Sequence, residues 1–173
     1  MAISLYDISV RSYLQILNST SAVLAKGCEY CEAEGIDLAE VVETRLRDDM
    51  LPFRFQVVST AHHSLGAIEG CKAGEFSPPP ASDGMDYASL AGLIGDAAEK
   101  LSALSEDEVN ALEGGDMVFR LGNNAIPFRN EGFIQSFSLP NFYFHATTTY
   151  DILRHLGAPL GKRDFLGQMR VNM

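Results

Sequence analysis

The sequence predicts an all-α protein: an up-and-down bundle of four long helices, with a short β-hairpin in the connection before the last helix. Apolar residues recur at helical spacing in four separate stretches. Glycine and proline residues stand where those stretches end or begin. Hydrophobic residues make up 46% of the chain and charged residues 21%, which is typical of a globular protein. A length of 173 residues fits one domain, spanning residues 1–173.

The first helix is predicted from about Ser4 to Glu34, because its apolar positions repeat every seven residues with further positions interleaved. These positions are Val10, Leu14, Leu17, Ser21, Leu24, Cys28 and Cys31. Ser4 and Asp7 have the spacing of a capping box, and Gly35 is a natural stop. A long helix with one apolar stripe is typical of a bundle.

The middle of the chain predicts a short helix and two further long helices. Asp37 can cap a short helix over residues 38–46, and Pro52 suits the first turn of a second long helix. We expect that helix to end at Gly70 or Gly74 and residues 76–84 to form a stiff connector. The apolar face of the third helix consists of Leu90, Leu93, Ile94, Ala97, Leu101 and Leu104.

The segment over residues 116–129 predicts the hairpin, because its apolar residues alternate with polar or smaller ones and Gly122 to Asn124 have turn chemistry. Asn130 then caps a last helical region. Pro140 interrupts this region, and Gly157 followed by Pro159 ends it.

Composition argues against several classes of function. The net charge is −10 with only 13 Lys and Arg residues, so no basic face is available for nucleic acid. No apolar stretch is long enough to span a membrane, and the N-terminus does not have the pattern of a signal peptide. Three cysteines do not make a disulfide framework, and Cys28 and Cys31 belong to the apolar stripe of the first helix. The chain is therefore expected in the cytoplasm.

Polar side chains on the last helix are the candidates for function. At about 100° per residue, Asn141, His145 and Thr149 fall on the same side as the apolar core positions. A buried Asn and His one turn apart can bind a metal or a small molecule, but they can equally be structural groups that bond neighbouring helices. On the second helix, His62 is expected at the flank of the core face and His63 toward solvent.

The opposite side of the last helix carries Tyr143, Tyr150 and Arg154. Tyr and Arg are favoured at protein interfaces, so this strip predicts a helix-to-helix homodimer. The alternative is an ordinary exposed face.

Three blocks of sequence resemble the DinB-like superfamily, in a branch catalogued only as a domain of unknown function. They are SLYDISVRSYLQIL at residues 4–17, DMLPFRFQV at residues 49–57 and LPNFYFHATTTYDILRHLGAPLGKRDFLG at residues 139–167. The resemblance implies a four-helix bundle, often dimeric. Many members bind a divalent metal through one His on the second helix and an HxxxH pair on the fourth, and some transfer low-molecular-weight thiols.

Carried onto this sequence, the resemblance places His145 at the second His of that pair, Asn141 at the first, and His62 at the remaining ligand position. Asn141 departs from the pattern, because an amide oxygen is a weak ligand for zinc or nickel. A divalent metal (Zn, Ni or Mn) is therefore expected to be absent or weakly bound. The favoured function is a bundle with an internal small-molecule or metal site. The alternatives are a non-catalytic homodimeric assembly protein and a metal-dependent thiol S-transferase.

Overall fold

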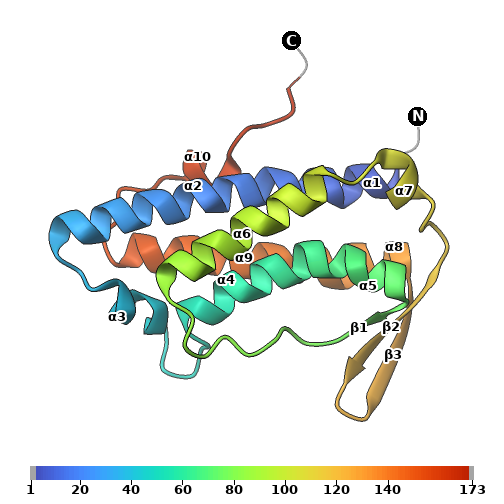
Figure 1. Cartoon of the computed structure of the whole chain (residues 1–173), viewed down its shortest axis with the longest axis horizontal. Helices are drawn as coiled ribbons and strands as arrows, with labels where there is room; N and C mark the ends of the chain where they lie inside the picture. The colour runs from blue at the N-terminus through green and yellow to red at the C-terminus, as the bar shows by residue number, and fades with distance from the viewer. Residues whose placement is uncertain (1–2, 172–173) are drawn as a thin grey trace.

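The structure is a computed structural model that describes residues 3–171, in which four long helical segments pack side by side (Figure 1). The first segment is α1 (Leu5–Ile8) with α2 (Val10–Glu34), and the third is α6 (Tyr87–Ser102). The second consists of α4 (Phe53–Ala61), the π-helical turn η1 (His62–Gly66) and α5 (Ala67–Ala73). The fourth consists of α8 (Asn130–Phe133), the π-helical turn η2 (Ile134–Ser138) and α9 (Leu139–His155). The predicted helical bundle is confirmed.

Local signals set the helix ends where the sequence predicts them. Ser4 and Asp7 form the capping box at the start of α1, and Gly35 ends α2 in the left-handed conformation with φ 69°. Asp37 caps the short helix α3 (Leu38–Glu43), and Ser105 caps α7 (Glu106–Asn110). Pro140 does not end the last helical segment. It lies in the first turn of α9, directly after η2, and the helix continues to His155.

The four segments do not simply alternate in direction. Phe53 and Tyr87, near the starts of α4 and α6, stack with ring centroids 5.6 Å apart, so these two helices run the same way. The connector from α5 to α6 accounts for this, because it runs back along the bundle before α6 begins (Figure 1). In α2 and α9, which are also parallel, the Tyr13 and Phe142 rings meet edge to face at 5.0 Å. Both α2 and α4 contact α6 and α9.

The predicted hairpin is confirmed as β2 (Asp116–Leu121) and β3 (Asn124–Arg129), which pair antiparallel. Gly122 has φ 58°, which a glycine adopts without strain. The sequence did not predict the third strand, β1 (Glu75–Phe76), which pairs parallel with β2 at the end of the bundle. The β1 strand brings Phe76 under the second helical segment, where the ring is buried.

The second helical segment is the central element of the core. α4 contacts both α6 and α9, and every residue from Gln56 to Ala61 is buried. The short helix α10 (Lys162–Leu166) packs on the outer side of α2, where the Ser19 hydroxyl donates to the Phe165 carbonyl at 2.8 Å. Over residues 3–171, no helix is both long and apolar enough to cross a membrane.

Candidate functional site

The two π-helical turns lie against each other and are joined by a hydrogen bond in the core. The Ser138 hydroxyl, at the end of η2, donates to the His63 carbonyl of η1 at 2.6 Å. The Tyr13 hydroxyl of α2 lies 2.7 Å from the same Ser138 oxygen. Because the Ser138 hydrogen is committed to a carbonyl, Tyr13 must be the donor in that pair. These hydrogen bonds join three helical segments at the point where π-helical turns interrupt two of them. Such turns are frequent at functional sites.

Two histidines stack beside these turns. The rings of His63 and His145 are nearly parallel, at 15°, with centroids 5.8 Å apart. His63 is 4% exposed and His145 is partly buried. Burial lowers the pKa of His63 to about 3, with a further contribution from His145 and His62, and burial lowers the pKa of His145 to about 4. Both imidazoles are therefore uncharged near neutral pH.

The tautomer of His145 follows from its neighbour Gln56. The Gln56 Nε2 donates to the Leu51 carbonyl at 2.8 Å, which orients the amide with its oxygen toward His145. The Gln56 oxygen lies 2.8 Å from His145 Nδ1, and because it can only accept, Nδ1 carries the proton. The lone pair of His145 is consequently on Nε2, and the bond from Nδ1 to Gln56 is the one hydrogen bond that this ring makes to the described residues.

His63 Nδ1 is a buried polar atom without a hydrogen-bond partner in the part of the chain that is described. Such atoms are uncommon, because burying a polar group without a partner costs about 1–3 kcal/mol. Phenylalanine side chains surround the pair. The ring centroids of Phe76 and Phe137 lie 5.4 and 5.6 Å from that of His63, and the ring centroids of Phe55 and Phe144 lie 5.8 and 5.2 Å from that of His145. The site therefore combines two neutral nitrogen groups with apolar walls.

The expected site residues lie in different surroundings in the structure. Asn141 and His145 lie one turn apart on α9, and the Asn141 Nδ2 donates to the Phe137 carbonyl at 2.7 Å. Thr149 is buried and its hydroxyl donates to the His145 carbonyl. His62 stacks on Phe76 at 4.4 Å.

The expectation that His63 points to solvent is wrong, and it is His63, not His62, whose ring stacks on His145. The reason is that the second helical segment has no free face at this point. Its neighbour α9 covers the side on which His63 lies, and Phe76 of β1 packs against the same ring.

A three-histidine metal centre of the kind that the resemblance implies does not fit these residues. The His62 Nε2 is bonded to the Ser77 carbonyl at 2.7 Å, and Asn141 supplies an amide in place of an imidazole. Within residues 3–171, no group of three or more His, Cys, Asp or Glu side chains is arranged to hold a metal ion. The donors that remain together are two imidazoles.

Sequence reasoning missed His63, Gln56 and Ser138. One signal could have found the first two: from Phe53 to Ile68 the only charged residue is Arg54. A helix that lacks a charged face is buried on all sides, so each of its polar residues needs a partner inside the protein.

Comparison with known proteins bears on the fold and the family. The sequence profile of a family described as a domain of unknown function (DUF1993) matches residues 5–166. A crystal structure of a DinB family member protein from Shewanella denitrificans is similar over 98% of this chain and 95% of that chain, with a TM-score of 0.81 and 23% sequence identity. No curated protein matches the sequence.

Proposed function

Because the chain belongs to the DUF1993 family and has a DinB-like fold, we propose that it is a small-molecule-binding bundle protein, with His145 as the principal ligand-contacting residue. The observation that carries the proposal is the neutral imidazole of His145, whose lone pair is held on Nε2 by the bond from Nδ1 to Gln56. Such a nitrogen accepts a hydrogen bond from an N–H or O–H group. The ligand class that this acceptor and the neighbouring aromatic rings favour is an aromatic organic molecule with one such donor.

The aromatic rings support an organic ligand rather than a bare ion. Phe55 and Phe144 meet the His145 ring edge to face, and Phe144 is 56% exposed. Binding sites for small molecules typically combine apolar walls with a few oriented polar groups. The lowered pKa of His145, about 4, also favours binding over proton abstraction, because a general base works best when its pKa is near the operating pH.

The experiment is native mass spectrometry and elemental analysis on the same tag-free protein, with the His145→Phe variant beside it. Phenylalanine keeps an aromatic ring at this position and removes both nitrogens. We expect an organic mass bound to the wild type that is absent from the variant. If no mass copurifies, indole, which has a single N–H donor, is titrated and followed by NMR. Indole that leaves the resonances of His145 unmoved contradicts the proposal.

A bound metal would be a different result. Stoichiometric zinc, nickel or manganese that is lost in His145→Phe would assign a metal centre to His145 and overturn the organic ligand. Neutral imidazole held by a hydrogen bond from its other nitrogen is a good metal ligand, so the elemental analysis tests a real alternative. Assays of thiol transfer would follow that result only.

A homodimer is the second candidate function, and one observation favours it. Tyr143 and Phe144, adjacent on α9, are 40% and 56% exposed. Of the strip expected to form the interface, Tyr150 instead packs on Phe165 at 5.9 Å, and the Arg154 guanidinium donates to the Leu160 carbonyl. The dimer face is therefore proposed at Tyr143 and Phe144. Light scattering at micromolar concentration that gives a monomer mass contradicts it.

A further inference from the structure

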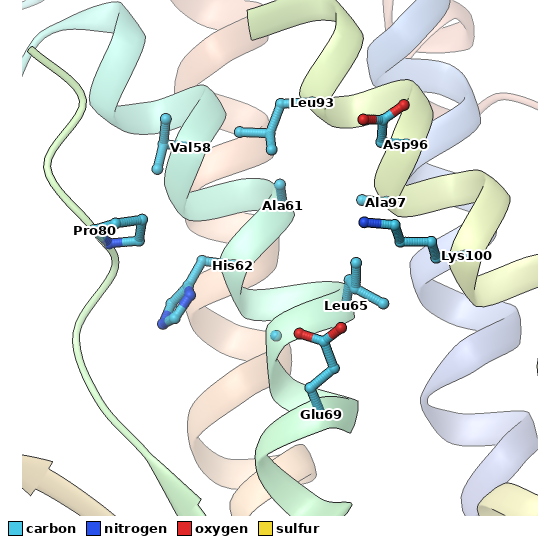
Figure 2. A pocket seen from close by; sticks show the side chains of 11 residues that line it. Val58, Ala61, His62, Leu65, Glu69, Pro80, Leu93, Asp96, Ala97 and Lys100 are labelled. Atoms are coloured by element: carbon cyan, nitrogen blue, oxygen red, sulfur yellow. The ribbon is translucent and has the colours of Figure 1, made fainter.

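A pocket lies on the side of the second helical segment that faces α6, away from the His63–His145 pair. Its volume is about 190 Å³, and Pro80 of the connector closes one side of it (Figure 2). His62 lines this pocket, whereas His63 and His145 do not. The pocket is therefore separate from the site proposed above, and its occupancy can be tested independently.

The floor of the pocket is apolar. Val58 and Ala61 of α4 face Leu93 and Ala97 of α6, with Leu65 of η1 beside them (Figure 2). Ala61 and Ala97 are buried, at 6% and 1% exposure, and their small side chains leave room at the floor of the pocket. A volume of this size accepts a fragment of one ring or a short alkyl chain.

The rim of the pocket carries two carboxylates and one ammonium, from Glu69, Asp96 and Lys100 (Figure 2). None of the three takes part in an ion pair within 4.0 Å of another described residue, although eight such pairs occur elsewhere in the described chain. The rim therefore has a net charge of −1 that no neighbouring side chain neutralises at close range.

His62 adds a hydrogen-bond acceptor to the lining. Its Nε2 lies 2.7 Å from the Ser77 carbonyl, which can only accept, so Nε2 carries the proton and Nδ1 carries the lone pair. A Cβ atom at Gly66 would lie 3.1 Å from His62 Nδ1. Because Gly66 has no side chain, the space beside this lone pair is open, and Gly66 itself lines the pocket.

We infer that this pocket binds a small organic monocation, a primary ammonium group on a short apolar body. The body occupies the floor formed by Val58, Ala61, Leu65, Leu93 and Ala97. The ammonium lies at the rim beside Glu69 and His62, which line the same side of the pocket, and the carboxylate of Asp96 across the pocket adds a second negative charge (Figure 2). The net charge of −10 on the whole chain adds a long-range attraction for cations and opposes anions.

The experiment is an NMR titration of the full chain with three probes of matched shape: phenethylammonium, 2-phenylethanol and 3-phenylpropanoate. We expect saturable shifts at the amides of Gly66 and Ala97 with phenethylammonium, weaker shifts with the alcohol, and none with the carboxylate. Equal shifts from all three probes, or no shift from any of them, overturn the proposal.

Four exposed residues provide the variants, each of which changes the charge by one unit. Glu69→Gln and Asp96→Asn are expected to weaken phenethylammonium binding about threefold each, and Lys100→Met to strengthen it by a similar factor, as for partly exposed ion pairs. The matched control is Glu99→Gln, because Glu99 lies on α6 but lines the groove toward α2 instead. An equal effect of Glu99→Gln would mean that only the overall charge matters, which overturns the site.

Phenylalanine separates a cation site from a zwitterion site. If it bound more tightly than phenethylammonium, and Lys100→Met weakened it, Lys100 would be a carboxylate anchor and the proposed monocation would be wrong.

Discussion

At the scale of the residue, the buried histidines make the stability of the fold depend on pH. The pKa values of His63 and His145, about 3 and about 4, lie below the value of about 6.5 for an exposed imidazole. Below pH 6.5 the unfolded chain therefore binds protons that the folded chain does not, so stability falls as the pH falls toward 4. We expect a loss of about 1–2 kcal/mol for each histidine between pH 7.5 and 5, measured by urea unfolding.

The variant His63→Phe tests the assignment, because it removes one of the histidines whose pKa is lowered and keeps a ring among Phe76 and Phe137. Its stability is expected to vary less with pH than that of the wild type. His155→Gln is the control, since His155 is exposed at the end of α9. A His155→Gln variant that flattened the pH profile as much as His63→Phe would contradict the prediction.

The hydrogen bond from His145 to Gln56 gives a second prediction at this scale. Gln56→Glu would place a carboxylate about where the amide oxygen now lies, 2.8 Å from His145 Nδ1. A negative charge at that distance favours the imidazolium, so the pKa of His145 should rise by about one unit or more. NMR titration of the imidazole protons measures it, with Gln135→Glu, at an exposed position of η2, as the control. An unchanged pKa of His145 would mean that the bond to residue 56 does not form.

The position of His63 explains why the site was only partly predictable. Helical periodicity places Asn141, His145 and Thr149 on the inner side of α9 because that helix has a distinct outer side, with Tyr143 exposed. The same argument failed at η1, where it placed His63 toward solvent although α6 and α9 cover this turn on two sides. Periodicity identifies a buried face only when another face is free.

At the scale of the element, the hydroxyl of Ser138 holds the two π-helical turns together. Ser138→Ala would leave the Tyr13 hydroxyl and the His63 carbonyl without their partner in the core. We expect a loss of about 2 kcal/mol in the free energy of unfolding, because unpaired buried polar groups are costly. Ser136→Ala, an exposed serine of the same turn, should cost much less.

A double-mutant cycle with Tyr13→Phe distinguishes a shared hydrogen bond from two independent effects. Tyr13→Phe removes the donor to Ser138, so part of the cost of Ser138→Ala should disappear in the double variant. Strictly additive losses would contradict the bonded chain from Tyr13 through Ser138 to His63.

Elements whose signals are local were predictable, and elements that depend on tertiary contacts were not. The capping box at Ser4, the stop at Gly35 and the hairpin turn at Gly122 are each encoded by a few adjacent residues. The strand β1 is two residues long and exists only because β2 pairs with it. The π-helical turns likewise carry no short sequence pattern, and their hydrogen bonds join segments far apart in the chain.

At the scale of the whole molecule, three helices approach closely at Gly27 of α2. A Cβ atom there would lie 2.7 Å from the Leu153 Cδ1 of α9 and 2.9 Å from the Tyr87 hydroxyl of α6. That hydroxyl donates to the Leu24 carbonyl, so it cannot move freely. Gly27→Ala should therefore force the helices apart and lower the free energy of unfolding by about 1–3 kcal/mol, as overpacking of a core does.

Gly92→Ala provides the opposite expectation with the same chemical change. Gly92 lies within α6, is exposed, and a Cβ atom there meets nothing within 4 Å. Because alanine favours a helix over glycine by about 1 kcal/mol, this variant should be more stable than the wild type. Thermal and urea unfolding of both variants therefore test the packing of the bundle, because the free energy of unfolding should fall in Gly27→Ala and rise in Gly92→Ala. If Gly27→Ala were also stabilising, the gain in helix propensity would exceed the cost of the close contacts at Gly27. In that case α2 would lie farther from α9 and α6 than the structure places it.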